Sequence, residues 1–197
     1  MSTKNSGIDG LSKSGKSILF MVALILALAV AWFVADRLAR RPASLDIEEC
    51  IAAASAKHGM PASLIRAIIW RESKFNPDIV GKANEIGLMQ ITEGAVSDWC
   101  RLNGKPTPSR KELFKPSVNI EIGTWYLAQA ARHWDGYKSQ EILTLSEYNA
   151  GYGNVSKGWK PKTPQDELKI SDIKIASTRQ YVETILAKKA EYEKKER

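Results

Sequence analysis

The sequence has little of what metal sites and disulfide frameworks need. Its 197 residues include two cysteines, Cys50 and Cys100, and two histidines, His58 and His133. Neither histidine stands at ligand spacing from the other or from a cysteine, so we expect no metal site. No motif requires an organic cofactor either. Strand patterns and internal repeats are also lacking, which argues against sheet-based and solenoid architectures.

A clustered basic patch is also missing from most of the chain, although the net charge is +7. The first 42 residues carry six basic and two acidic residues, whereas the remainder carries 23 basic and 20 acidic residues. Nucleic-acid binding needs positive charge gathered on one face. The charge after residue 42 is dispersed, so we expect no nucleic-acid partner.

What is present first is a long apolar run. Residues 17–35 carry no charge, and a 19-residue helix rising about 1.5 Å per residue comes close to spanning a hydrocarbon core of about 30 Å. A cleaved signal peptide is the alternative, because Ala29-Val30-Ala31 has the form of a cleavage site and Lys13 and Lys16 precede the run. Both interpretations export the rest of the chain.

The expected organisation follows from that run. We expect a single-pass protein of a bacterial inner membrane, with its folded domain in the periplasm or outside the cell. The predicted parts are a disordered tail at 1–16, a transmembrane helix or uncleaved signal anchor at 17–35, a linker at 36–44 and one domain at 45–197. In such a domain Cys50 and Cys100 can form a disulfide or remain as two buried thiols, and both possibilities stay open.

Beyond the linker, apolar periodicity and capping residues predict helix after helix, and therefore an all-α domain. Long loops are expected at 105–116 and 159–173, where prolines are frequent. The expected helix starts include Thr92, Asn119, Ser139 and Thr178.

Glu72 is the most informative residue of the predicted domain. With helical spacing it shares one face with Ile65, Ile68 and Ile69. A carboxyl on an apolar face loses solvation of its charged form, so its pKa should rise and it can donate a proton near neutral pH. Alternatively, Glu72 turns to water at the helix end or pairs with a neighbouring cation.

Four segments occur together in a distinctive order, namely Glu72-Ser73, Gly87-Leu88-Met89-Gln90, Tyr148-Asn149-Ala150-Gly151 and Tyr181-Val182. As a set, over residues 45–190, they resemble the catalytic domain of soluble-type lytic transglycosylases. That family is glycoside hydrolase family 23 and has a fold like goose-type lysozyme.

The resemblance implies roles for these residues. Glu72 matches the single catalytic acid and base, and Ser73 a polar neighbour that orients substrate. Gly87, Leu88, Met89 and Gln90 match the segment that lines the glycan cleft, with Met89 as an apolar surface for a sugar ring. Tyr148 and Asn149 match the opposite wall, and Tyr181 a tyrosine near the acid. Glu147 and Glu93 depart from the usual family pattern.

The implied substrate is peptidoglycan, cleaved between N-acetylmuramic acid and N-acetylglucosamine to leave a 1,6-anhydromuramoyl end. A hydrolytic muramidase is one alternative, in which Glu85 or Glu147 positions a water. A non-catalytic peptidoglycan-binding scaffold is the other. Anchored cleavage fits both wall turnover and the opening of a gap for a secretion or pilus apparatus.

Overall fold

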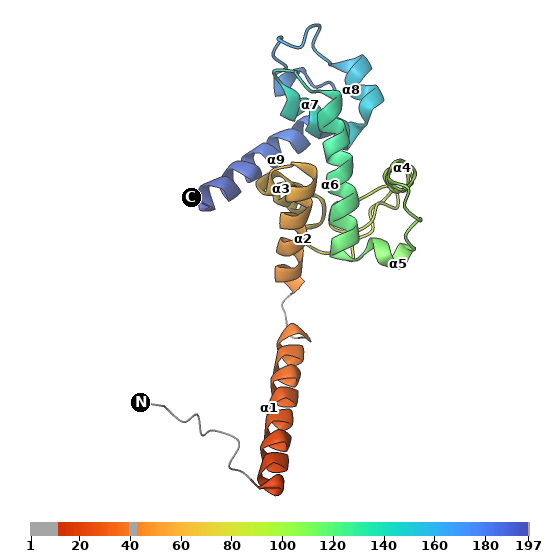
Figure 1. Ribbon diagram of the computed structural model, residues 1–197. Coiled ribbons are helices and arrows are strands. Elements are labelled where there is room, and N and C mark those ends of the chain that lie inside the picture. The colour runs from red at the N-terminus through yellow and green to blue at the C-terminus, as the bar shows by residue number, and fades with distance from the viewer. Residues whose placement is uncertain (1–11, 40–42, 197) are drawn as a thin grey trace. The chain divides into compact units, whose positions relative to one another are not determined.

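The computed structural model describes residues 12–39 and 43–196 (Figure 1). The chain divides into two compact units, Met1–Ala43 and Ser44–Arg197, and each is described by itself.

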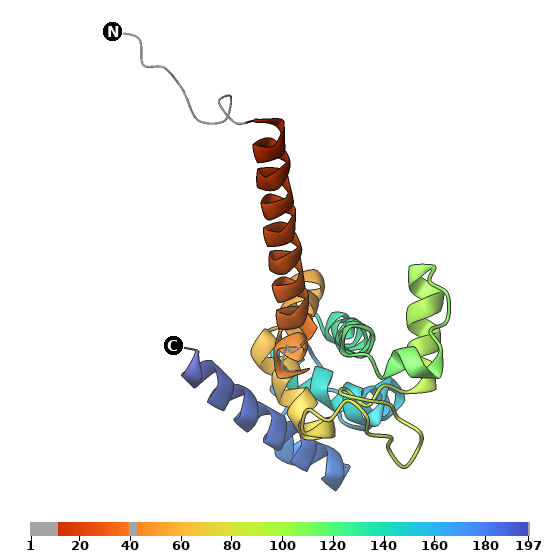
Figure 2. The ribbon, with the colours of Figure 1, turned by 90° about the horizontal axis from the view of Figure 1, so that it is seen from below.

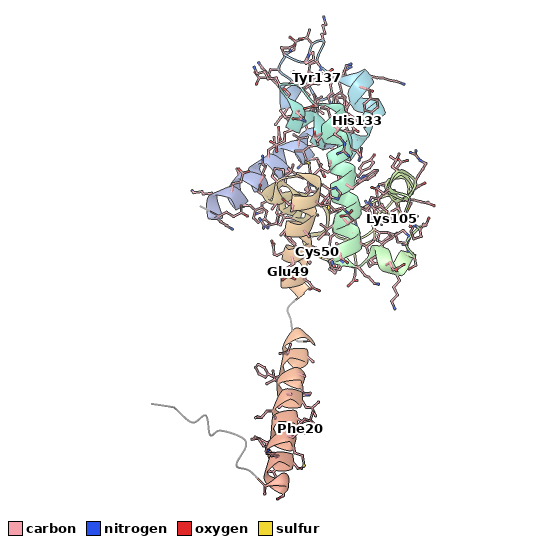
Figure 3. The ribbon with its side chains drawn as sticks, in the orientation of Figure 1. Phe20, Glu49, Cys50, Lys105, His133 and Tyr137 are labelled. Atoms are coloured by element: carbon pink, nitrogen blue, oxygen red, sulfur yellow. The ribbon has the colours of Figure 1, made fainter. Side chains whose placement is uncertain are left out.

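The described part of the first unit is dominated by one helix, α1 (Lys13–Ala39). Its stretch Ser14–Ala35 has a mean hydropathy of 2.9 and buries none of its surface within the protein. Large apolar side chains such as Phe20 project outward along it (Figure 3). By length and composition α1 is able to cross a membrane, although a signal sequence has the same properties. The helix extends beyond 17–35 at both ends, while residues 1–11 and 40–42 lie outside the described residues.

The second unit is helical, which confirms the expected all-α class. Residues 43–196 contain no strand, only isolated bridges from Val80 to Ile86 and from Ile86 to Ile91. Its elements are α2 (Ala43–His58), α3 (Ala62–Ser73), α4 (Glu93–Asn103), α5 (Arg110–Leu113), α6 (Pro116–His133), α7 (Gln140–Ala150), α8 (Tyr152–Gly158), the 3₁₀ turn η1 (Ile170–Asp172) and α9 (Ala176–Lys195).

Helix α6 occupies the middle of this unit. Figures 1 and 2 show α3 and α9 on one side of it and α4 and α5 on the other. Helix α3 packs along α9, and α6 packs on α7, α4 and α5. The buried core includes Ile65, Ile68 and Ile69 of α3 and Val182 and Ile185 of α9, all 0% exposed. Burying aliphatic side chains in this way supplies the main driving force for packing the helices.

Two predicted helix starts are confirmed and two are wrong. Thr92 caps α4, its hydroxyl accepting from the Ala95 N–H at 3.2 Å, and Ser139 precedes α7. Helix α6 begins at Pro116 rather than Asn119, because proline suits the first helical turn and frees the asparagine for a tertiary role. Helix α9 begins at Ala176 rather than Thr178, whose hydroxyl also bonds elsewhere.

The two predicted loops contain short helices. Residues 105–116 include α5, which Ser109 and Glu112 start with a reciprocal capping box. Residues 159–173 include η1. Helix α8 was not predicted at all, because Gly151 and Gly153 around its start are more typical of a loop than of a helix.

Candidate functional site

Glu72 lies in the last turn of α3, on the helical face that the sequence predicted. Ile65, Ile68 and Ile69 of that face are fully buried, whereas Glu72 itself is half-buried. Burial raises the pKa of the Glu72 carboxyl above its ordinary value. A carboxyl with a raised pKa that still reaches solvent can hold a proton and deliver it to a ligand.

Tyr181 of α9 fixes the orientation of this carboxyl. Its phenol donates to Glu72 Oε1 at 2.7 Å, and its ring is 2% exposed. Burial, followed by the nearby Glu72 charge, raises the pKa of Tyr181 well above its ordinary value, so the phenol keeps its proton and remains a donor. This contact joins residues 109 positions apart through the packing of α3 against α9.

Two charged residues act on Glu72 in opposite directions. The positive charge of Arg71 and the hydrogen bond from Tyr181 lower the pKa of Glu72, whereas the negative charge of Glu85 raises it. Burial is the largest effect, and the net direction is upward. Glu85 therefore lies within electrostatic range of the candidate acid.

The segment Gly87-Leu88-Met89-Gln90 is mostly buried. Leu88 and Met89 are 0% exposed, and Met89 packs against Gly123 of α6, where an added Cβ would lie 2.6 Å from the Met89 sulfur. The expectation that the Met89 side chain offers a surface to a sugar ring is therefore corrected. The sequence predicted contact with substrate because Met89 belongs to the segment that matches the lining of the glycan cleft. In the structure its apolar side chain is held in the core instead.

Asn119 holds this segment in place, a role that the sequence analysis missed. Its amide nitrogen donates to the carbonyls of Ile86 and Leu113, each at 2.8 Å, and its carbonyl accepts from the Met89 N–H at 2.8 Å. Gly87 has a φ of 72° and passes so close to Asn119 that a Cβ there would lie 2.5 Å from the amide nitrogen. The signal available in the sequence for this role was a polar asparagine among the apolar residues of a predicted helix.

Tyr148 and Asn149, at the end of α7, connect this helix to Met89 and to α9. The Tyr148 phenol donates to the Met89 carbonyl at 2.9 Å, and its ring meets Tyr126 edge to face at 5.9 Å. Burial, followed by the charge of Glu72, raises the pKa of Tyr148 well above its ordinary value. The exposed Asn149 accepts at its side-chain carbonyl from the Thr178 hydroxyl of α9 at 2.8 Å.

Ser73 and Gln90 make internal hydrogen bonds. Ser73 is 2% exposed and its hydroxyl donates to the Ile69 carbonyl at 3.1 Å. Gln90 has a φ of 47°, and its amide nitrogen donates to the carbonyls of Gly87 and Ile79 at 2.9 and 3.3 Å. Both residues thus help to shape the surroundings of Glu72, and Gln90 remains partly exposed.

The two other candidate carboxylates differ in setting. Glu147 is turned into the protein, with a side chain 4% exposed, and its Oε1 lies 2.7 Å from His133 Nδ1. Figure 3 marks His133 near the end of α6, close to α8. Glu85 is partly exposed and accepts from the Ala83 N–H at 2.9 Å. Glu85, rather than Glu147, is therefore the carboxylate available near Glu72.

Hollows in the surface adjoin the site without including the acid. One of about 470 Å³ lies between residues 83–93 and the segment around α5, and one of about 30 Å³ lies beside Tyr126 and Tyr148. Glu72 lines neither hollow, so the candidate site is defined by the contacts of its carboxyl. Cys50 and Cys100 are free thiols. Among the side chains that the structure describes, no group of three or more from His, Cys, Asp and Glu is placed to hold a metal ion.

Comparison with known proteins adds independent evidence. A sequence model of the transglycosylase SLT domain matches residues 49–170. The chain is similar to the lytic transglycosylase Slt of Pseudomonas aeruginosa, solved as an inactive glutamate-to-glutamine mutant, with 30% identity and a TM-score of 0.66 over 75% of this chain and 24% of that one.

Two further solved structures give the same picture. The 70-kDa soluble lytic transglycosylase Slt70 of Escherichia coli matches with 28% identity and a TM-score of 0.66 over 73% of this chain and 23% of that one. A complex of a 70-kDa soluble lytic transglycosylase with bulgecin A matches with 27% identity and a TM-score of 0.65 over 74% and 24%. The chain thus spans about a quarter of the length of these proteins.

Proposed function

The chain belongs to the transglycosylase SLT domain family, and from that membership we propose that it is a peptidoglycan lytic transglycosylase with Glu72 as its acid and base. The observation that carries this proposal is the hydrogen bond from the buried Tyr181 phenol to Glu72, at the end of an isoleucine face. The hydrogen bond fixes the orientation of the carboxyl, and burial raises its pKa.

In the first step Glu72 acts as the acid. Its proton passes to the glycosidic oxygen between N-acetylmuramic acid and N-acetylglucosamine, and the bond from that oxygen to the muramoyl C1 breaks. The electron-poor C1 is stabilised by the substrate's own 2-acetamido group, so no protein nucleophile is needed. A raised pKa favours the protonated form of Glu72 that this step requires.

In the second step Glu72 acts as the base. Now a carboxylate, it takes the proton from the muramoyl C6 hydroxyl, whose oxygen bonds to C1. The product is a 1,6-anhydromuramoyl end, the acid is regenerated, and no water is consumed. The Tyr181 hydrogen bond supports this half of the cycle because it stabilises the charged carboxylate.

The substrate-binding roles of the other motif residues are part of the same proposal. Asn149 is exposed beside Thr178 and is available for polar contacts with sugar hydroxyls and acetamido groups. Gln90 and Tyr148 would form the neighbouring wall, whereas Gly87, Leu88 and Met89 contribute through their backbone. Ser73, being buried, would act by holding the end of α3.

The SLT match also bears on location. A wall-cleaving domain has to lie where peptidoglycan is, so we propose that α1 anchors the chain in the inner membrane and leaves the domain in the periplasm or outside the cell. A reporter fused after Arg197 should be active only on the outer side of that membrane. Release of a shorter mature chain would instead identify α1 as a signal peptide.

A muramidase remains the second candidate, because Glu85 lies within electrostatic range of Glu72. In that case Glu85 would position a water for attack on C1, and the product would carry a reducing end. The hydrogen bond from the Ala83 N–H to Glu85 instead favours a role for Glu85 in shaping its own loop. The Glu85→Gln variant separates the two roles.

Mass spectrometry of the products tests the proposal directly. Purified sacculi are digested with the detergent-solubilised full chain, with Glu72→Gln and with Glu85→Gln. We expect anhydromuramoyl products from the wild type and from Glu85→Gln, and none from Glu72→Gln. Reducing-end products that disappear in Glu85→Gln would establish a muramidase. Binding to sacculi without any product would favour the scaffold.

A further inference from the structure

A cluster of basic and aromatic side chains lies along the α3–α9 pair, close to the end of α3. Lys74 Nζ lies 3.1 Å from the centroid of the Trp70 ring, and Lys188 Nζ lies 4.7 Å from the same centroid. The Arg71 guanidinium carbon lies 5.7 Å from the centroid of the Tyr181 ring. We call Arg71, Lys74 and Lys188 the basic patch.

The positive charges of the basic patch are only partly balanced. Lys188 pairs with Glu191 at 2.5 Å. Among the side chains that the structure describes, those of Arg71 and Lys74 form no hydrogen bond or ion pair, and Arg71 interacts with Glu72 through its charge alone. Partial burial, followed by the charges of Arg71 and Lys188, lowers the pKa of Lys74. Like charges this close repel one another, and a bound anion would relieve that repulsion.

The backbone conformation of Lys74 brings its ammonium group close to the other cations of the basic patch. Lys74 ends α3 in the left-handed conformation, with φ 53°, and its N–H donates to the Trp70 carbonyl at 3.2 Å. Glycine is the usual residue at such a helix end, because a β-carbon is crowded there. A lysine at this position instead carries its ammonium group back over the Trp70 ring, towards Lys188.

We infer that the basic patch binds the carboxylates of the peptide attached to the muramoyl residue that is being cleaved. This inference rests on the proposed function, because the bond next to Glu72 would then belong to a muramoyl residue, whose lactyl group carries the peptide. Arg71 directly precedes Glu72, so the patch begins beside the acid. Peptidoglycan peptides carry several free carboxylates, which suit guanidinium and ammonium groups.

The test compares two forms of one substrate. Rates of cleavage are measured for glycan strands with their peptides and for strands stripped of peptides by an amidase. The chains are the full-length wild type, Lys74→Gln/Lys188→Gln and the matched control Lys105→Gln/Lys111→Gln, which removes the same charge. Figure 3 shows Lys105 beside α4 and α5, and α6 separates these helices from α9 in Figures 1 and 2.

The preference for peptide-bearing strands, as a ratio of kcat/KM values, should fall about 5- to 10-fold in Lys74→Gln/Lys188→Gln through a higher KM. The control pair should keep the wild-type ratio. Charge reversal in Lys74→Glu/Lys188→Glu should lower the ratio further, and added salt should lower it in the wild type. An unchanged ratio in both patch variants would overturn the inference.

Binding separates this inference from the proposed function. Sedimentation with intact and with peptide-stripped sacculi is measured in the Glu72→Gln background, which does not depend on cleavage. Weaker binding of the patch variants to intact sacculi alone supports the inference even where no product forms. If instead the patch variants lose binding to phosphatidylglycerol vesicles and bind both kinds of sacculi normally, the patch serves a membrane surface and the inference is wrong.

Discussion

Two regions of the helical domain each place a glutamate against a single ring-bearing partner, and they differ in the consequences. On the α3–α9 side, Glu72 is half-buried and receives a hydrogen bond from the phenol of Tyr181 at 2.7 Å. On the α6–α7 side, Glu147 is almost fully buried and lies 2.7 Å from the imidazole of His133. Its second oxygen, Oε2, has no hydrogen-bond partner among the described residues.

The difference shows what suits a carboxyl to proton transfer. Glu72 has a neutral donor on one oxygen and access to solvent, so it can exchange protons with a ligand. Glu147 has a basic partner and almost no access, so its contact joins α7 to the end of α6 rather than facing a substrate. Similar distances thus accompany different roles, and exposure and partner chemistry distinguish them.

The largest expected effect on the cleavage rate comes from replacing each of the two glutamates with glutamine. Glu72→Gln should lower the rate of sacculus cleavage by at least about 10²-fold and up to about 10⁴-fold, because a positioned acid is removed. Glu147→Gln should leave the rate within about threefold of the wild type, because Glu147 is not placed to reach substrate. Release of soluble muropeptides measures both. Equal losses in the two variants would break the comparison.

Stability should show the opposite ranking. His133→Ala leaves the buried Glu147 carboxyl without its partner, and an unsatisfied buried polar group costs about 1–3 kcal/mol. Urea unfolding of His133→Ala should therefore show a clear loss of stability with near-normal activity. The matched control is His58→Ala, which removes the other histidine–glutamate contact but leaves Glu121 paired with Lys57. A larger loss in the control would contradict the argument.

Removing the donor to Glu72 should give an intermediate effect on activity. In Tyr181→Phe the carboxyl loses a hydrogen bond that lowers its pKa, so its pKa should rise further. The alkaline limb of the pH profile of kcat/KM should move to higher pH, and the rate should fall about tenfold because orientation is lost. Tyr126→Phe is the control. A limb that moves to lower pH would disprove the assigned direction.

The smallest effect should appear in the dependence of stability on pH. Because the folded pKa of Glu72 is raised, the folded state holds this proton more tightly than the unfolded state does. Stability from this group is present below the unfolded pKa of about 4.3 and is lost as pH rises through the folded value. Glu72→Gln should therefore melt a few degrees higher than the wild type at pH 7.5, and the gain should vanish near pH 4. A constant difference would argue against a raised pKa.

The local part of the site could be predicted from the sequence. Helical spacing placed Glu72 beside Ile65 and Ile68, and Thr92 marked the start of α4, because these depend on neighbours within a few positions. The all-α class followed from the same periodicity and is confirmed. The family resemblance, rather than any spacing, supplied Tyr181 as a partner of the acid.

The remaining contacts join residues too far apart for a local pattern. Asn119 and Thr178 have side chains suited to starting a helix, and both instead form tertiary hydrogen bonds, to Met89 and to Asn149. The core position of Met89 depends on the gap left by Gly123 on a separate helix. Such choices are made by three-dimensional packing, which a one-dimensional pattern does not contain.

The three hydrogen bonds of Asn119 also affect the local unfolding of residues 86–89. They make one side chain of α6 the clamp for residues 86–89, so this segment and α6 should form one cooperative unfolding unit. In hydrogen exchange, the Met89 amide should then be protected nearly as long as the amides in the middle of α6, although it lies in a turn. The wall next to Glu72 would thus be as durable as the helix behind it.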